Sequence, residues 1–187
     1  MRQRSTGISM TQMNSINPLS KTGQKNISGW APRYSEELRN YEGIIQGRER
    51  IHGEMATQLI HGYYACTSYV DAQIGKVLNK VRELGMDQNT IIILTGDHGF
   101  KLGDYGSWCK HTNFEIDTRV PLIISTPSQT PGKTESLAEM VDIYPTLADL
   151  CSFELPKHCE GTSLKSILRN PQAEVKELAI SQYPRKN

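Results

Sequence analysis

Residues 91–99, Ile-Ile-Ile-Leu-Thr-Gly-Asp-His-Gly, decide the fold of this chain because they join an apolar run to two potential metal ligands. β-branched residues favour a strand, and an unbroken apolar run is typical of a strand buried on both faces. Asp97 and His98 follow at its carboxyl end, where open α/β sheets gather their ligands. The flanking glycines allow a tight turn and the close approach of a ligand or another backbone segment. Asp and Gly also end strands as ordinary turns, so both interpretations stand at this point.

The patterning on either side of this stretch predicts an alternation of helices and strands, which indicates an α/β fold. In chain order we expect a long helix over 54–84, a strand over 90–95, a second buried strand over 120–125, a helix from near Asp142 to Cys151 with Pro145 in its first turn, a short amphipathic piece within 160–170 and a final strand over 177–183. Residues 1–52 have few periodic apolar positions, and we expect loop, extended chain and at most short turns there.

Composition and charge exclude several classes of function. The chain has 187 residues, 37% of them hydrophobic, which suits one ordinary soluble domain. Lys and Arg number 21 against 20 Asp and Glu, so the net charge of +1 gives no reason to expect a nucleic acid or an anionic membrane as partner. No apolar stretch is long enough to span a bilayer, and the first five residues lack the apolar run of a secretory signal.

The four cysteines do not form a Cys-x-x-Cys pair or a disulfide framework. Cys66 falls in the long helix, and we expect it to be a small core residue. Cys109 is expected to fill space in a loop. Cys151 and Cys159 bracket a short loop, and we expect two free thiols there in preference to a local disulfide.

Residues 96–119 read GDHGFKLGDYGSWCKHTNFEIDTR and combine charged, histidine and aromatic residues without helical or strand periodicity. A long connection of this kind is functional or disordered, and its aromatic residues favour a loop packed on the sheet edge. Such a loop would hold Lys101, Lys110 and His111 near the Asp97-His98 pair, although Lys101 alone is expected to be an ordinary solvated lysine. Cations beside a metal ion suit the binding of sulfate or phosphate. An ion pair between Glu115 and Arg119 is expected to brace the loop.

Several ordered motifs in the chain resemble the sulfatases of the alkaline-phosphatase-like superfamily, and most of all the iduronate-2-sulfatase branch. The resemblance covers roughly residues 57–185 and implies a partial sulfatase α/β fold with a mixed sheet flanked by helices. The matching motifs are Tyr63-Tyr64-Ala65, Ser68-Tyr69-Val70-Asp71, Gly96-Asp97-His98-Gly99, Leu102-Gly103-Asp104-Tyr105-Gly106, Trp108-Cys109-Lys110-His111-Thr112-Asn113-Phe114-Glu115, Thr118-Arg119-Val120-Pro121-Leu122-Ile123, Val141-Asp142-Ile143-Tyr144-Pro145-Thr146-Leu147 and Ser181-Gln182-Tyr183-Pro184-Arg185.

The resemblance implies hydrolysis of a sulfate ester by a formylglycine nucleophile beside a divalent cation. Asp97 and His98 match the later pair of metal ligands, and Lys110 matches the lysine that contacts the sulfate and assists the leaving oxygen. His111 stands where related bacterial sequences place a histidine, and it is a candidate contact for sulfate or sugar. An Asp beside a His is more typical of zinc or manganese, but the resemblance implies calcium, which we expect ahead of the other two.

The departures from the family pattern are equally informative. No cysteine here is followed by the Pro and Arg of the formylglycine motif Cys-x-Pro-Ser-Arg, and no earlier Asp-Asp pair supplies the first metal ligands. We therefore expect the back half of a sulfatase: a loop-rich segment over 1–52, the C-terminal portion of the catalytic domain over 53–170 and the start of a truncated C-terminal subdomain over 171–187. By itself this chain is expected to be inactive.

A sulfated sugar is the expected substrate, for example a 2-sulfated uronic acid of a glycosaminoglycan, and the missing N-terminal half is a candidate partner. Full-length relatives are commonly periplasmic, extracellular or lysosomal, which leaves the compartment of this chain open. Two alternatives remain at the level of the sequence. In the first alternative to a sulfatase fragment, the chain is a non-catalytic remnant. In the second, it is part of a related metal-dependent phosphodiesterase or phosphonate hydrolase, for which zinc would be the metal.

Overall fold

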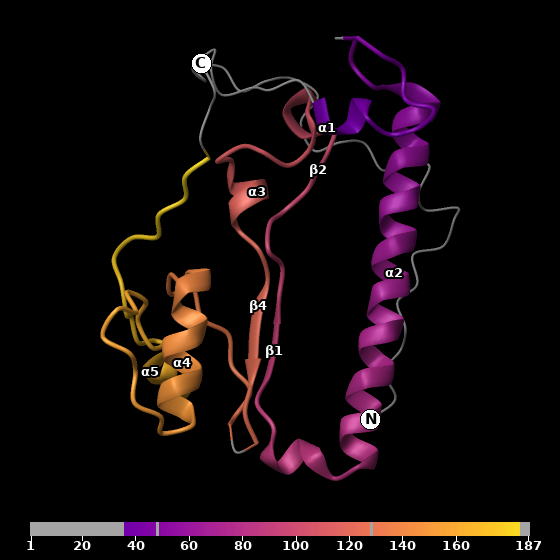
Figure 1. Cartoon of the computed structure of the whole chain (residues 1–187). Coiled ribbons are helices and arrows are strands. Elements are labelled where there is room, and N and C mark those ends of the chain that lie inside the picture. The colour runs from indigo at the N-terminus through magenta and orange to yellow at the C-terminus, as the bar shows by residue number, and fades with distance from the viewer. Residues whose placement is uncertain (1–35, 48, 128, 184–187) are drawn as a thin grey trace. The chain divides into compact units, whose positions relative to one another are not determined.

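The computed structural model describes residues 36–47, 49–127 and 129–183, which form two compact units (Figure 1). In the described part of the chain, unit 1 comprises residues up to Met86 together with His98–Arg119. Unit 2 comprises Asp87–Asp97 together with the residues from Val120 onward. None of the described helices has the length and apolar content needed to cross a membrane.

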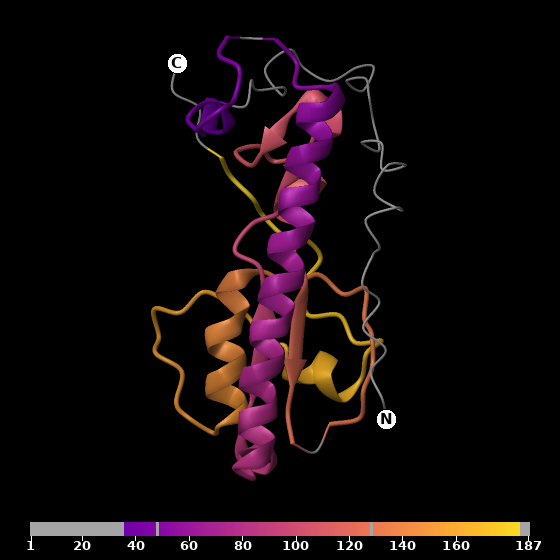
Figure 2. The same cartoon turned by 90° about the vertical axis from the view of Figure 1, so that its right-hand side faces the viewer.

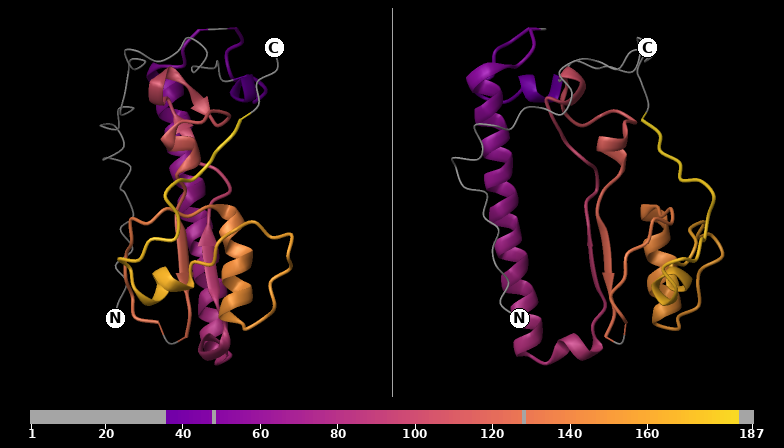
Figure 3. Two further views of the ribbon diagram at one scale, coloured as in Figure 1. Left: turned by 90° about the vertical axis from the view of Figure 1, so that its left-hand side faces the viewer. Right: turned by 180° about the vertical axis from the view of Figure 1, so that it is seen from behind.

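Unit 1 is built around one long helix. Helix α2, Gly53–Glu83, has 31 residues and confirms the helix expected over 54–84. Figures 2 and 3 show it as a single unbroken helix. It ends where Gly85 adopts a left-handed φ of 66° and donates its N–H to the carbonyl of Arg82, a conformation that glycine adopts without steric cost.

The other elements of unit 1 are short. They are helix α1 (Glu36–Arg39), strand β2 (Lys101–Leu102), the 3-10 turn η3 (Asp104–Gly106), strand β3 (Trp108–Cys109) and helix α3 (Glu115–Thr118). Strands β2 and β3 pair in antiparallel fashion, with Lys101 opposite Cys109 and Leu102 opposite Trp108. The expectation of at most short turns before residue 53 holds for the described residues, where α1 is a single helical turn, while residues 1–35 lie outside the described part.

The core of unit 1 joins α1, the start of α2 and the β2–β3 hairpin. Its buried members are Leu38, Ala56, Ile60, Trp108 and Cys109. The hairpin is therefore held by two helices, which the sequence pattern did not predict. The expectation that Cys66 is a core residue was wrong, because its side chain is exposed. Helical periodicity shows which face of a helix is apolar. It does not show which part of that face is buried by other residues of the same unit.

Unit 2 contains a two-stranded ribbon. Strand β1 (Ile92–Thr95) and strand β4 (Leu122–Ser125) pair in antiparallel fashion and confirm the two expected strands. They are not buried on both faces as expected, because the directly paired Leu94 and Ile123 are 40% and 56% exposed. Figures 1 and 3 show helices α4 (Ile143–Leu150) and α5 (Lys165–Arg169) on the same side of this ribbon. Only one face of the ribbon is thus covered within the unit.

The later elements of unit 2 agree with the sequence except at the end. The turn η4 (Met140–Asp142) leads into α4, with Pro145 in its first turn as expected. Proline is tolerated there because the first N–H groups of a helix have no partner within it. The strand expected over 177–183 is absent from the described structure. The N–H of Ile180 instead donates to the carboxylate of Glu139 at 2.9 Å. A side chain thus accepts the hydrogen bond that a neighbouring strand would accept in a sheet.

Asp142 is the polar anchor of unit 2. Its buried carboxylate accepts the N–H groups of Glu139 at 2.7 Å and Thr162 at 2.8 Å, and pairs with the ammonium of Lys176 at 2.6 Å. Burial acts to raise the pKa of Asp142, but Lys176 and the two backbone donors outweigh it and hold that pKa below its ordinary value. One carboxylate therefore connects the start of α4 to two later segments of the chain.

Replacing Asp142 by Asn should destabilise unit 2 by about 3 kcal/mol, because breaking a buried ion pair leaves the remaining charge without compensation. A carboxyl group with a lowered pKa stabilises the fold above its ordinary pKa, near 4, and that contribution is lost as the pH falls through the lowered value. The difference between wild type and Asp142→Asn should therefore shrink in acid. Denaturant unfolding followed by circular dichroism at neutral and acidic pH measures both effects.

Asp71→Asn is the matched control, because it makes the same chemical change at an exposed position of α2. It should change the free energy of unfolding by less than about 0.5 kcal/mol. Equal stabilities for the two variants at neutral pH would contradict the anchoring role of Asp142.

Candidate functional site

The loop of residues 98–119 begins with a close backbone contact. Gly99 donates its N–H to the carbonyl of Asp117 at 2.8 Å. A Cβ at Gly99 would collide with the carbonyl oxygen of Ile116, so only glycine fits there. We expected the glycines beside Asp97 and His98 to allow a ligand or another backbone segment to come close. At Gly99, the backbone segment that comes close belongs to this same loop.

Backbone strain is concentrated around Lys110. Tyr105, Cys109 and His111 have φ values of 55°, 61° and 80°, so three residues with side chains adopt the left-handed region. Each such residue costs on the order of 1 kcal/mol or more and persists only where its surroundings enforce it. Because Cys109 and His111 flank Lys110, the strain sets the direction in which this short segment presents its side chains.

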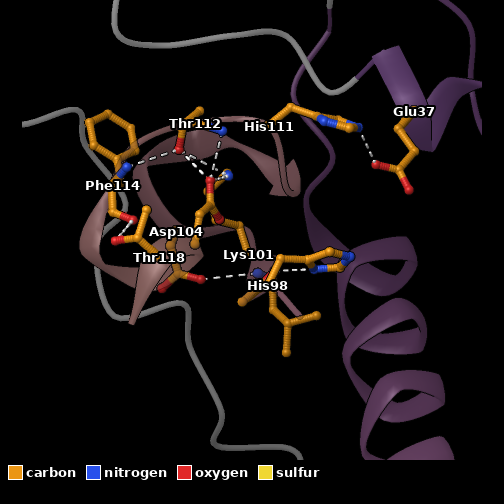
Figure 4. Close-up of polar contacts among 11 residues, drawn as sticks. Glu37, His98, Lys101, Asp104, His111, Thr112, Phe114 and Thr118 are labelled. Carbon is orange, nitrogen blue, oxygen red and sulfur yellow. Dashed lines mark hydrogen bonds and ion pairs between the residues drawn. The ribbon is translucent and has the colours of Figure 1, made fainter. Parts of the chain in front are cut away.

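A buried ion pair closes the loop. Lys101 is 1% exposed and its ammonium contacts the buried carboxylate of Asp117, which the hydroxyl of Thr112 also contacts. The N–H of Thr112 donates to the same carboxylate oxygen at 3.0 Å. Figure 4 labels Lys101 and Thr112 and draws the polar contacts of Thr112 as dashed lines inside the loop. The expectation that Lys101 is a solvated lysine was wrong, because the chain supplies a buried counter-charge 16 residues later.

Two further contacts support the loop at its surface. The expected ion pair between Glu115 and Arg119 is confirmed at 3.3 Å, with side chains that are 73% and 69% exposed. Exposed pairs of this kind contribute about 0.5 kcal/mol or less. The rings of Tyr105 and Phe114 pack at a centroid distance of 4.9 Å. The buried Lys101–Asp117 pair is thus the main polar constraint on the loop.

Lys110 and His111 converge on one carboxylate. The Nζ atom of Lys110 lies 2.5 Å from Oε1 of Glu37, and Nε2 of His111 lies 3.0 Å from Oε2. Figure 4 shows the imidazole of His111 directed at Glu37 on α1. The side chain of Glu37 is 22% exposed, while those of Lys110 and His111 are 25% and 42% exposed, so the cluster is partly open to solvent. We call these three residues the Glu37 cluster.

The charges of the Glu37 cluster reinforce one another. Burial acts to raise the pKa of Glu37, but the hydrogen bond and charge of Lys110 and the contact with His111 leave that pKa below its ordinary value. The hydrogen bond to Glu37 is the main reason that the pKa of Lys110 lies above its ordinary value. At neutral pH the cluster therefore holds a carboxylate against an ammonium. No sequence motif identified Glu37, because it lies in the segment with few periodic positions.

The two expected metal ligands lie where the chain passes from unit 2 back to unit 1. Asp97 is the last residue of its segment in unit 2, and His98 is the first residue of the returning segment of unit 1. The Nδ1 atom of His98 lies 2.9 Å from the carbonyl oxygen of Gly99. Among the described residues, no three His, Cys, Asp or Glu side chains are grouped so as to hold a metal ion. The association of Asp97 and His98 with Lys110 and His111 therefore stays a prediction.

Calcium takes six to eight oxygen ligands, and Asp97 with His98 supplies one carboxylate and one imidazole. These residues alone do not fit a complete calcium site.

All four cysteines are free thiols, as expected for Cys151 and Cys159, and they differ in burial. Cys109 is fully buried in the core of unit 1. Burial, together with the charge of Glu37, raises the pKa of Cys109 to about 11. A thiol that is buried and protonated is a poor nucleophile, so Cys109 has a packing role beside Lys110.

Comparison with known proteins identifies the family of this chain. The family model described as Sulfatase matches residues 20–153. The chain belongs to the sulfatase family. Among curated sulfatases, iduronate 2-sulfatase of Mus musculus is 33% identical over 169 residues, and the match covers 66% of this chain and 31% of that protein. The chain thus spans less than a third of the length of this relative.

Two solved structures extend the comparison to the fold. The structure of a protein in complex with its substrate, D-glucosamine-2-N,6-O-disulfate, matches with a TM-score of 0.64 and 30% identity, over 72% of this chain and 30% of that one. The phosphonate monoester hydrolase from Silicibacter pomeroyi matches with a TM-score of 0.63 and 34% identity, over 66% and 25% of the two chains. The sulfatase chain therefore has the expected partial alkaline-phosphatase-like fold.

Thiol labelling of this sulfatase chain should distinguish the buried cysteine from the exposed ones. Cys66 and Cys151 are exposed and should react readily with an aromatic disulfide reagent. At pH 8 only about one molecule in a thousand carries a thiolate at Cys109, given its pKa of about 11. Cys109 should react only after unfolding, as mass spectrometry of labelled peptides can show. Labelling of Cys109 in the native chain at the rate of Cys66 would contradict its burial.

Replacing Asp117 by Asn should destabilise unit 1 by about 3 kcal/mol, because the ammonium of Lys101 stays buried without its counter-charge. Labelling of Cys109, which pairs with Lys101 across the hairpin, should become faster in this variant. Glu115→Gln removes a carboxylate from the same helix but only from an exposed pair, and should change stability by less than about 0.5 kcal/mol. Equal labelling rates in both variants would show that the buried pair does not hold the hairpin.

Proposed function

We propose that this chain carries the anion-binding part of a sulfatase active site, in which Lys110 and His111 hold the sulfate group of a sulfate ester. The observation that carries this proposal is their convergence on the two oxygens of one carboxylate, at 2.5 and 3.0 Å. A sulfate group presents pairs of oxygens to two such donors in a similar arrangement. Membership of the sulfatase family supports sulfate as the anion.

The roles of the two side chains follow from their chemistry. An ammonium such as that of Lys110 has three donors and a compact charge, which suits a group with several anionic oxygens. Charge develops on the leaving oxygen as the sulfur–oxygen bond breaks, so a cation held there stabilises the transition state more than the bound ester. His111 would orient the sulfate group or contact the sugar. Strain at Cys109 and His111 keeps the segment preorganised for both tasks.

We further propose that Asp97 and His98 supply two ligands of a divalent metal ion, with calcium the expected metal. Sulfatases generally use a metal ion and a formylglycine. Because the described residues do not build a complete metal site, we assign no step of the reaction to the metal. Formylglycine and the first metal ligands would lie in sequence that corresponds to the part of the relatives that this chain does not span.

The proposed substrate is a sulfated carbohydrate. The name of the mouse relative and the sugar disulfate bound in the matched structure both support a sulfated sugar. The proposed protein partner is the remainder of a sulfatase domain. The exposed apolar pair of Leu94 and Ile123, and the exposed Val70 and Val77 of α2, are surfaces that such a partner would cover.

Hydrolysis of a phosphonate monoester is the second candidate function. It is supported by the fold and the 34% identity shared with the phosphonate monoester hydrolase. The same two donors would serve a phosphonate oxygen equally well, so the Glu37 cluster does not separate the two reactions. An activity comparison between an aryl sulfate and a phenylphosphonate ester, on the chain joined to a complementary N-terminal sulfatase segment, would separate them.

Binding of inorganic sulfate tests the proposed function on the chain itself. Lys110→Met should weaken sulfate binding at least about tenfold in isothermal titration calorimetry, because a charge-assisted contact is removed. Lys157→Met is the matched control, since Lys157 is an exposed lysine of unit 2 outside the site. It should leave the affinity unchanged.

Two results would contradict the proposed function. One is the same sulfate affinity in Lys110→Met and Lys157→Met. The other is the absence of any sulfate binding in wild type at concentrations where generic surface lysines begin to bind anions, which would favour a non-catalytic remnant.

A further inference from the structure

We infer that Glu37 is a resident counter-ion of the Lys110–His111 anion site, and that a sulfate group binds there by displacing it. The inference rests on the proposed function and adds a regulatory contact to the same site. Glu37 belongs to α1, outside every motif quoted above as resembling the sulfatases. It is nevertheless the group that the two predicted sulfate-contacting side chains bind in the described structure.

Occupation by Glu37 and by sulfate is mutually exclusive for steric and chemical reasons. A sulfate oxygen within hydrogen-bond reach of both Lys110 Nζ and His111 Nε2 would lie where the carboxylate of Glu37 now lies. The Nε2 atom of an imidazole carries at most one hydrogen, so it can donate to only one acceptor at a time. Lys110 has three hydrogens, but one of them already donates to Oε1 of Glu37 at 2.5 Å.

The carboxylate is an imperfect occupant, which favours its replacement. Its Oε2 atom faces His111 at 3.0 Å, yet this buried atom makes no hydrogen bond of good geometry in the described part of the chain. A buried acceptor without a hydrogen bond costs free energy. A sulfate group has more oxygens and no chain attached to it on the α1 side, so it can adjust to both donors at once.

Displacement requires only the side chain of Glu37 to move. The neighbouring Leu38 is 2% exposed and belongs to the core of unit 1. The guanidinium of Arg39 contacts the backbone carbonyls of Ile45 and Glu49. These contacts hold α1 in place on both sides, while the Glu37 side chain has three rotatable bonds and partial access to solvent. The cluster can therefore exchange anions without unfolding α1.

The test compares sulfate binding in Glu37→Gln with that in wild type. The amide keeps the size of the side chain but removes its charge, so sulfate affinity in isothermal titration calorimetry should rise about tenfold. Glu42→Gln is the matched control, because Glu42 is exposed and forms no ion pair with another described residue. It changes the net charge equally and should leave the affinity unchanged.

An unchanged or weaker affinity in Glu37→Gln would overturn the inference, because Glu37 would then support the site instead of occupying it. An equal rise in Glu37→Gln and Glu42→Gln would also overturn it, since general charge repulsion would explain both. Native protection of Cys109, which packs with Leu38, reports whether the variant keeps its fold. If Glu37→Gln does not fold, Glu37→Asp provides the same test, because the shorter carboxylate cannot span both donors and should also raise sulfate affinity.

The double variant Glu37→Gln/Lys110→Met separates this inference from the proposed function. If sulfate binding depends on Lys110 but is indifferent to Glu37, the function stands and the inference fails. If the tighter binding of Glu37→Gln persists without Lys110, the anion is bound elsewhere, and both fail.

Discussion

The buried ion pair between Lys101 and Asp117 is the constraint on which the candidate site depends. Two charges out of contact with water are stable only when each compensates the other. One oxygen of Asp117 contacts Lys101 and also binds Thr112, immediately after His111, while its other oxygen is buried without a hydrogen bond in the described part of the chain. Because one carboxylate joins the first strand of the hairpin to the segment that follows it, Lys110 and His111 lie on a loop closed at both ends. The left-handed residues beside Lys110 can persist only in a loop held in this way.

Unit 2 uses the same physical solution in a different place. The carboxylate of Asp142 is buried and binds the backbone at two separate positions as well as Lys176. In the described part of each unit, a buried carboxylate thus joins segments that are distant in sequence. The difference lies in what the carboxylate supports. In unit 1 it supports the loop that carries the partly buried Lys110 and His111, whereas in unit 2 it supports the start of a helix.

The Glu37 cluster pairs two basic side chains of the proposed anion site with a carboxylate of the same chain. Ionic groups that face one another without a ligand avoid the cost of an unpaired charge in a partly buried position. The chain places its own carboxylate against Lys110 and His111, and the strained backbone directs both side chains at that position. Under the inference above, such an arrangement would exchange one anion for another. It therefore favours ligands that carry a full charge and several oxygens.

The sequence by itself determined the long helix α2, the strands β1 and β4, the start of α4 at Asp142 and membership of the sulfatase family, because periodicity and ordered motifs are local properties of the chain. The sequence also identified Lys110 and His111 as candidate contacts for a sulfate group. Only the tertiary structure decided that Lys101 is buried, that Cys66 is exposed and that Glu37 faces the site. Burial and ion pairing depend on segments 16 or more residues apart, and no local pattern records which of them come together. The same reason explains why Leu94 and Ile123 are exposed although an apolar run predicts a buried strand: the pattern of an apolar strand does not say what covers it.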